Sequence, residues 1–357
     1  AHYGEPYAPA LSTWASLEIV PEHRLADENI NDTEFSRDPV GSGPYQLNRW
    51  QAGQSISLSA FDGWHREGPY IDEVTFRILP DKTTQFLELA ANNIDQMGLS
   101  PALYRRTFPS RPDLRERVAT YKHLGSNYTY LGFNLRRAPF DDRRVRRAIA
   151  HAIDRQQLID GVLLGLGERI AAPYKPGTRW YPEGLEPYAF APDRARALLS
   201  EAGWADRDDD GVREKDGAEL RFDIVTNNDN QQRKIAATII QRRLKKVGIQ
   251  VELRLVEWAT LLSRFINPHD FDAVLLGWSL SLDPNQYSIW HSSQQDPSQF
   301  NFVGLEDPAV DRLLEQGLRT FDKAERTAIY HRFAAELHEA VPVVYLYAPY
   351  SLSAVHR

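Results

Sequence analysis

The residues with the clearest potential for ligand chemistry lie in residues 271–286, which read FDAVLLGWSLSLDPNQ. An apolar run ends there at Gly277 and Trp278, and a short polar loop leads to an Asp-Pro-Asn turn at 283–285. In open α/β sheets the ligand crevice lies outside the carboxyl ends of the strands, so we expect this strand end at the mouth of a cleft. The segment holds no nucleophile, metal cluster or phosphate loop, and it therefore predicts binding without catalysis.

Several aromatic and polar side chains near such strand ends are candidates for ligand contacts. Trp278 is predicted to form a cleft wall, because ligand pockets are lined mainly by apolar and aromatic side chains. Tyr287 and Trp290 follow in the same region and either stack on a ligand or pack beneath the loop. Tyr128 begins a candidate strand, and Asn227 ends another strand just before a helix, where Asn also serves as a helix cap.

An acidic stretch further along the chain resembles the beginning of a calcium-binding loop. Asp206, Asp208, Asp210 and Gly211 match its first, third, fifth and sixth positions, but Gly217 stands at the twelfth, where a bidentate Glu is required. The stretch also lies between a helix and a strand, whereas a calcium loop of this type joins two helices. We therefore expect a solvated turn here. The scattered histidines form no paired set on one helix, so no protein-built metal site is expected.

Composition limits the classes of protein that this chain represents. Its 357 residues favour two domains, and a formal net charge of −7 argues against a nucleic-acid partner. The absence of cysteine excludes disulfides and thiolate metal sites, and no apolar run is long enough to span a bilayer. The sequence contains no hydrolase elbow, zinc-protease motif, phosphate-binding loop or complete dinucleotide fingerprint. We therefore expect no enzymatic activity and no cofactor.

The periodicity of apolar residues predicts an α/β organisation. One long helix is expected over 145–163, with Gly165 as its stop. Further helices are expected at 83–92, 192–202, 230–247, 258–265, 308–318 and 322–340, and strands at 220–226, 249–256, 272–277 and 342–347. The strands and helices alternate from Leu220 onward, which predicts a mostly parallel sheet covered by helices.

Three long segments in this order resemble one known family. They are residues 39–81 (PVGSGPYQLNRWQAGQSISLSAFDGWHREGPYIDEVTFRILPD), 131–159 (LGFNLRRAPFDDRRVRRAIAHAIDRQQLI) and 307–347 (DPAVDRLLEQGLRTFDKAERTAIYHRFAAELHEAVPVVYLY). The chain resembles the extracytoplasmic solute-binding proteins of family 5, the peptide-, dipeptide- and nickel-binding receptors of ABC importers. The resemblance implies a two-lobed periplasmic-binding-protein-like α/β fold of type II and ABC permease subunits as partners. It also implies a periplasmic or cell-surface location, with or without a lipid anchor.

The resemblance also implies how the chain is divided. Members of the family carry about another third of chain before the position of Ala1, the size of a further domain, so the first lobe is expected to be incomplete. We expect that lobe to comprise residues 1–122 and 345–357, and the second lobe to comprise 123–344. The hinge is expected near 122–127 and 341–346, where the chain crosses between lobes that close around the ligand.

Ligand identity follows from the resemblance only in outline. In many peptide-binding relatives an Asp a few residues after the Gly-Trp pair anchors the ligand's α-amino group, and this position is Ser281 here. The nearest carboxylate, Asp283, is interpreted as part of a turn. A peptide is the expected ligand. The alternatives are a blocked or differently charged peptide, an oligosaccharide and chelated nickel. A sensor or scavenger without a transport role is a further alternative.

Overall fold

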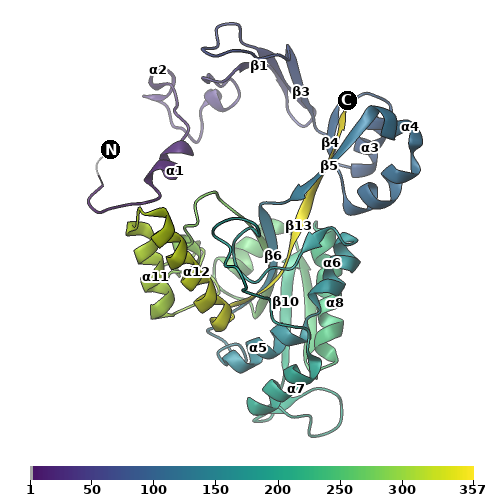
Figure 1. Cartoon of the computed structure of the whole chain (residues 1–357), viewed down its shortest axis with the longest axis vertical. Helices are drawn as coiled ribbons and strands as arrows, with labels where there is room; N and C mark the ends of the chain where they lie inside the picture. Colours follow the sequence, from purple (N-terminus) through teal and green to yellow (C-terminus); the bar gives the residue numbers. More distant parts are fainter. Residues whose placement is uncertain (1–2) are drawn as a thin grey trace. The chain divides into compact units, whose positions relative to one another are not determined.

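The computed structural model of the protein describes residues 3–357 (Figure 1). The chain divides into two compact units. Unit one comprises the N-terminal residues up to Ser12, Pro101–Ser110 and Tyr121–Leu352, and unit two comprises Thr13–Ser100, Arg111–Thr120 and Ser353–Arg357. The chain passes between the units at several points, two of which lie inside strands, in β5 (Val118–Leu124) and β13 (Val343–His356). The expected hinge segments stay a prediction, and the passage in β13 lies later along the chain than the expected 341–346.

Unit one is built on a mixed sheet in which the strands follow the order β11-β10-β12-β6-β13. β10 (Arg221–Asn227) pairs in parallel with β11 (Gln250–Val256) and with β12 (Ala273–Ser279). β6 (Asn127–Phe133) is antiparallel to both β12 and β13. The expectation of a mostly parallel sheet is therefore wrong, because both pairings of β6 are antiparallel. β10, β11 and β12 are consecutive strands of the parallel part, and helices connect each of them to the next.

The long helix expected over 145–163 is two helices, α5 (Arg143–Ala152) and α6 (Arg155–Leu163). Ile153 adopts an extended conformation, and the side chain of Asp154 accepts a hydrogen bond from the backbone N–H of Gln157, which starts α6 as a new helix. Both helices bury their apolar faces in the same core, so the apolar spacing continues across the break. Periodicity alone therefore does not detect it.

The other expected helices and strands of unit one are confirmed, with small shifts at their ends except in β13. The remaining α-helices and strands of this unit are β7 (Gly167–Glu168), α7 (Pro192–Glu201), β8 (Glu214–Lys215), β9 (Ala218–Glu219), α8 (Gln231–Lys245), α9 (Trp258–Thr260), α10 (Tyr287–Trp290), α11 (Pro308–Arg319) and α12 (Lys323–Ala340). α9 continues as a π-helical turn over Leu261–Ile266. β13 is longer than expected, because the strand continues through Pro349 to His356. The carbonyl oxygen of Pro349 accepts a hydrogen bond from the N–H of Gly125 at 2.9 Å.

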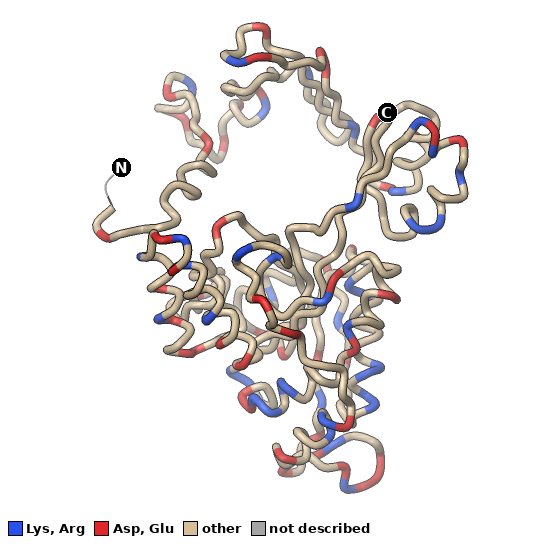
Figure 2. The backbone as a smooth tube through the Cα atoms, viewed as in Figure 1, with Lys and Arg blue, Asp and Glu red and all other residues tan. Residues whose placement is uncertain are grey.

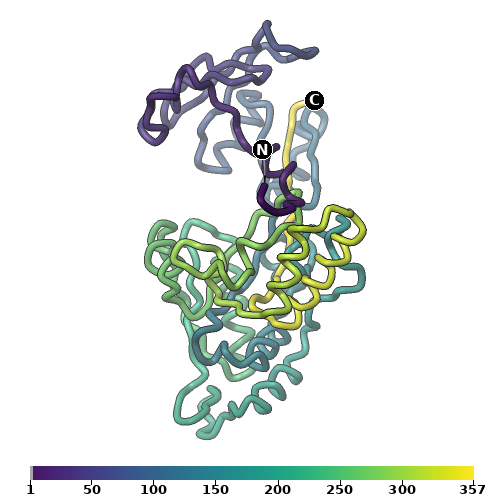
Figure 3. Tube along the Cα trace, turned by 90° about the vertical axis from the view of Figure 1, so that its left-hand side faces the viewer, coloured from purple at the N-terminus to yellow at the C-terminus, as the bar shows by residue number. Residues whose placement is uncertain are grey.

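Two apolar cores cover the two faces of this sheet. Along β12, Ala273 and Leu275 belong to one core, whereas Val274 and Leu276 belong to the other, as the period of a strand requires. Helices α5, α6, α7 and α8 supply the first core, and α11 and α12 supply the second. Figures 1 and 3 show α11 and α12 side by side as a helix pair. The sheet is thus held rigidly between two helical layers.

Unit two contains a three-stranded antiparallel sheet and a few short helices. Its elements are α2 (Glu22–Leu25), β1 (Tyr45–Gln51), β2 (Ser55–Ala60), β3 (Glu73–Arg77), α3 (Lys82–Ala90), β4 (Gln96–Gly98) and α4 (Pro112–Arg117), while α1 (Ala10–Ala15) begins in unit one. α3, expected over 83–92, is confirmed, and Asp81 caps it by accepting the N–H of Thr84. Among residues 3–357 no helix is long and apolar enough to cross a membrane.

Buried tyrosines make the stability of unit one sensitive to high pH. Burial raises the pKa of Tyr128, Tyr130, Tyr174 and Tyr345, all of which belong to the core beside α12. Tyrosines in the unfolded chain have a pKa of about 10. In the folded state the four buried side chains keep their protons at that pH. The free energy of unfolding should therefore fall as the pH rises above about 10.

A pH titration that records phenolate absorbance and circular dichroism together checks this prediction. We expect part of the tyrosine absorbance to appear only when the helical signal is lost. Ionisation of every tyrosine while the circular dichroism stays native would contradict it.

Candidate functional site

A cavity of about 140 Å³, here called the strand-end cavity, opens in unit one where β10 and β12 end and α8 begins. Its walls come from the start of β6, the end of β12, the first turn of α8 and the middle of β13. The lining residues are Asn127, Tyr128, Thr129, Asn230, Gln232, Arg233, Gly277, Trp278, Ser279, Tyr347 and Pro349. Arg233 is the one charged residue among them.

Strand direction and a helix cap explain why these segments meet. β10 and β12 are parallel, so their carboxyl ends lie at the same edge of the sheet. α8 follows β10 after a short loop, and the side-chain oxygen of Asn230 caps it by accepting the backbone N–H of Arg233 at 3.0 Å. Helix N-termini carry a partial positive charge. The first turn of α8 therefore adds positive potential to the cavity.

Arg233 is a half-buried cation with unused hydrogen-bond donors. Its Nη1 donates to the side-chain oxygen of Asn227 at 2.7 Å, and burial lowers its pKa, opposed by the charge of Asp229. Asp229 itself accepts a hydrogen bond from the amide of Asn227. Within residues 3–357 no carboxylate forms an ion pair with Arg233. A guanidinium has five N–H donors, so this side chain is able to bind an anionic group in the cavity.

Gly277 allows the close packing on which this arrangement depends. A Cβ at this position would lie 2.7 Å from the backbone oxygen of Tyr128 and 3.2 Å from Nη2 of Arg233. The first distance is shorter than real Cβ contacts, and the atom it meets is backbone. The absence of a side chain at Gly277 therefore lets β6 and Arg233 both lie against the end of β12.

Aromatic side chains form the apolar part of the cavity. Trp278 is half-buried and meets Phe300 edge to face, with ring centroids 5.5 Å apart, while Phe302 stacks behind it at 6.3 Å. Tyr347 is buried, and its hydroxyl has no hydrogen-bond partner of ordinary geometry among residues 3–357. Burial raises the pKa of Tyr347, so the hydroxyl stays protonated near neutral pH. The cavity thus combines one cation with an aromatic wall.

The structure brings together some of the residues predicted from sequence. Trp278 and Tyr128 face each other across β12 and β6 and both line the cavity. Asn227 is buried behind it and contacts Arg233. The structure does not test whether these side chains contact a ligand, so those assignments stay predictions.

The other predicted residues do not line the strand-end cavity. Ser281 is exposed, and its Oγ donates to the backbone oxygen of Asp283 at 2.7 Å. Tyr287 stacks on His291 with ring centroids 4.1 Å apart, and Trp290 is buried in the core beside α12. Their roles as ligand contacts likewise stay predictions.

Sequence reasoning missed Arg233, Thr129 and Tyr347. A signal for Arg233 was present, because a cation in the first turn of a helix that follows a strand end is well placed to meet an anion. Tyr347 gave no such signal, since it lies in an apolar run that reads as a core strand. Both residues become recognisable only once the strands are arranged in the sheet.

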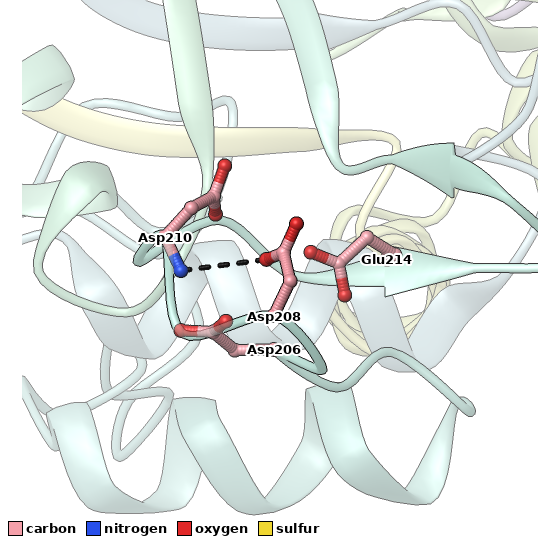
Figure 4. A group of neighbouring side chains, drawn as sticks. All are labelled: Asp206, Asp208, Asp210 and Glu214. Atoms are coloured by element: carbon pink, nitrogen blue, oxygen red, sulfur yellow. Dashed lines mark hydrogen bonds between the residues drawn. The ribbon is translucent and has the colours of Figure 1, made fainter.

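The acidic stretch after α7 gathers more carboxylates than the sequence motif indicates. Figure 4 shows Glu214 together with Asp206, Asp208 and Asp210, and one carboxylate oxygen of each lies within 4.8 Å of the others. The aspartates also hold the loop, since the N–H of Gly211 donates to Asp206 at 3.1 Å. Figure 2 shows this loop as a red stretch. Three of the four acids are exposed, and the expectation of a solvated turn stays a prediction.

Comparisons with known proteins agree on one family. The family model described as "Bacterial extracellular solute-binding proteins, family 5 Middle" matches residues 1–300. The oligopeptide-binding protein AppA of Bacillus subtilis (strain 168) is 34% identical over 353 residues, which cover 97% of this chain and 63% of that protein. The nickel-binding periplasmic protein of Escherichia coli (strain K12) is 28% identical over 339 residues, which cover 92% of this chain and 63% of that protein.

Solved structures show the same fold. The structure of AppA from Bacillus subtilis in complex with a nonapeptide superposes with a TM-score of 0.82 at 31% identity, over 99% of this chain and 70% of that one. The expected two-lobed periplasmic-binding-protein-like α/β fold class is therefore confirmed. The chain spans less than two thirds of the length of the two curated relatives named above.

The close approach at Gly277 predicts the effect of a single methyl group. Gly277→Ala should lower the free energy of unfolding by about 1–3 kcal/mol, because the new Cβ collides with the backbone of β6. Urea denaturation followed by circular dichroism measures the change. Ser279→Ala, at an exposed position of the same strand, is the matched control and should change it by less than about 0.5 kcal/mol. Equal midpoints for the two variants would contradict the prediction.

Proposed function

The chain belongs to the bacterial extracellular solute-binding proteins of family 5, and on this premise we propose that it is the substrate-binding receptor of an ABC importer. In this proposal it captures peptides outside the cytoplasm, in the periplasm or at the cell surface, and delivers them to membrane permease subunits. Support comes from AppA, an oligopeptide-binding protein whose structure holds a nonapeptide. No catalytic step is part of the proposal.

The observation that carries the proposal is the guanidinium of Arg233 in the strand-end cavity, which has no carboxylate partner within residues 3–357. A peptide ends in a carboxylate, whose two oxygens match the planar fork of an arginine. The N-terminus of α8 adds positive potential at the same place. We therefore propose Arg233 as the anchor of the peptide's C-terminal carboxylate.

The neighbouring side chains then acquire complementary roles. Trp278 offers a flat apolar face against which peptide groups of many shapes pack. Tyr128 closes the cavity floor, and Asn227 orients Arg233. Recognition of the terminus and main chain leaves peptide side chains free, which suits a receptor for mixed sequences.

The expected lobe division belongs to this proposal. It assigns residues 1–122 with 345–357 to one lobe and 123–344 to the other, with hinge segments near 122–127 and 341–346. The passage of the chain from unit two to unit one at Thr120–Tyr121 lies beside the first hinge segment, which supports that part of the assignment.

Native mass spectrometry of the protein as purified, with identification of what is released on denaturation, tests the proposal directly. Release of mixed short peptides, in a total amount equal to that of the protein, would support peptide capture. A single chelated nickel complex or oligosaccharide would overturn it in favour of a dedicated solute receptor, and the nickel-binding relative makes the metal complex the first alternative to examine. If the protein emerges free of ligand, calorimetry with synthetic peptides replaces the identification, and binding of none of them would count against peptide capture.

The importer role requires a separate experiment in the cell. Deletion of the gene should abolish uptake of the peptides that the purified protein binds. Unchanged uptake would instead indicate a sensor or a scavenger that binds peptides without delivering them to a permease.

The carboxylate anchor predicts a paired loss of affinity. Arg233→Gln should weaken the binding of a peptide with a free C-terminus by about 10- to 100-fold, the range expected for losing a hydrogen bond to a charged group. The C-terminal amide of the same peptide should bind the unchanged protein equally weakly, and Arg233→Gln should weaken it little further.

Isothermal titration calorimetry measures all four combinations of protein and peptide. Arg242→Gln, at an exposed position of the same helix, is the control and should bind both peptides as the unchanged protein does. A similar loss for acid and amide in Arg233→Gln would show that Arg233 does not hold the carboxylate.

A further inference from the structure

Asp283 lies in the loop that joins β12, the strand of Trp278, to α10, and it is paired with Arg326 of α12. Nη2 of Arg326 donates to one carboxylate oxygen of Asp283 at 2.8 Å, and Nη1 donates to the other at 2.9 Å. The two side chains are only 9% and 16% exposed. Both oxygens of Asp283 are therefore engaged inside the protein, in the two-point geometry that makes an arginine–carboxylate pair specific.

Arg326 is itself held by other elements of unit one. Its Nε donates to the backbone oxygen of Gly317 in α11 at 2.9 Å, and its guanidinium lies over the rings of Tyr330 and Trp180 at 5.4 and 5.9 Å. Tyr174 adds a hydrogen bond from its hydroxyl to the backbone oxygen of Pro284 at 3.1 Å. The loop is thus attached to the helix pair α11 and α12.

The loop is also fixed along its own length. The carboxylate of Asp283 accepts the N–H of Asn285 at 2.9 Å, and the side chain of Asn285 accepts the N–H of Tyr287 at 2.9 Å. At the other end, the N–H of Leu280 donates to the backbone oxygen of Ser126 at 2.7 Å. Asp283 is the point at which this local network meets the ion pair with α12.

We propose that Asp283 and Arg326 are positioning residues for ligand capture, which hold residues 279–286 so that Trp278 stands correctly at the strand-end cavity. The inference rests on the proposed function. Removing one partner of a buried pair leaves the other charge uncompensated, so the loop would leave its packed position. Asp283 acts through the loop and offers no free carboxylate to a ligand's amino group.

A comparison of two forms of one peptide separates positioning from direct contact. In Asp283→Asn, the affinities for tetra-alanine and for N-acetyl tetra-alanine should fall by the same factor, about tenfold, because the cavity wall is displaced for both. A loss confined to the peptide with a free amino group would show that Asp283 binds the ligand directly, and would overturn the proposal. Asp193→Asn, which changes an exposed ion pair on α7, is the matched control and should leave both affinities unchanged.

The double variant provides a second criterion. Arg326→Gln leaves the charge of Asp283 buried without its partner, whereas Arg326→Gln combined with Asp283→Asn removes both charges. The double variant should therefore bind N-acetyl tetra-alanine more tightly than Arg326→Gln alone. Additive losses in the two single variants would contradict the existence of a coupled positioning pair.

Hydrogen exchange gives a readout that needs no ligand. In Asp283→Asn, the amides of residues 279–290 should exchange at least about tenfold faster, while those of β10 and α8 keep their protection. Unchanged exchange in this loop would overturn the proposal whether or not any peptide binds. If the loop is loosened but no peptide binds the unchanged protein, the positioning pair stands and the peptide-binding function fails.

Discussion

The parallel pairing of β10 with β12 is the constraint on which the candidate site depends. Parallel strands end at the same edge of a sheet, so Asn227 and Trp278 reach one place although they are far apart in the sequence. The helix that follows β10 must then begin at this edge, and it carries Arg233 in its first turn. Antiparallel β6 starts at the same edge and adds Tyr128. The chemistry of the strand-end cavity therefore follows from strand direction and not from a local motif.

The way in which unit one uses its buried arginines makes Arg233 distinctive. Arg155 donates to three backbone oxygens, and burial lowers its pKa to about 10. Arg146 donates to backbone oxygens near the end of α12, and Arg326 donates to a carboxylate and a backbone oxygen. Each of these three arginines joins different elements and satisfies oxygen acceptors that would otherwise lack a hydrogen bond. Arg233 has one side-chain acceptor among the described residues and lines the cavity, as expected of a binding group.

Sequence reasoning succeeded where the local pattern determines the structure. The strands β10, β11 and β12 and the helix α8 follow from periodicity, and the position of Trp278 at a strand end follows from them. The break between α5 and α6 was missed, because Ile153 keeps the apolar spacing while its backbone turns extended. The antiparallel placement of β6 and β13 depends on chain crossings that periodicity does not record. Arg233 and Tyr347 become neighbours only in three dimensions, so no spacing in the sequence predicts that they line one cavity.

The size of the strand-end cavity limits what the proposed anchor can hold. At about 140 Å³ it is smaller than the roughly 300–1,000 Å³ of pockets that enclose drug-sized ligands, so under the proposed function it holds an end group and not a whole peptide. An end group is the part that peptides of every sequence share. Holding it tightly requires walls that lose little freedom on binding, because ordering a mobile loop subtracts from affinity. The pairing of Asp283 with Arg326 meets this requirement, since it fixes the loop beside Trp278 before any ligand arrives. Broad specificity for sequence and a rigid site for the terminus are therefore compatible in one architecture.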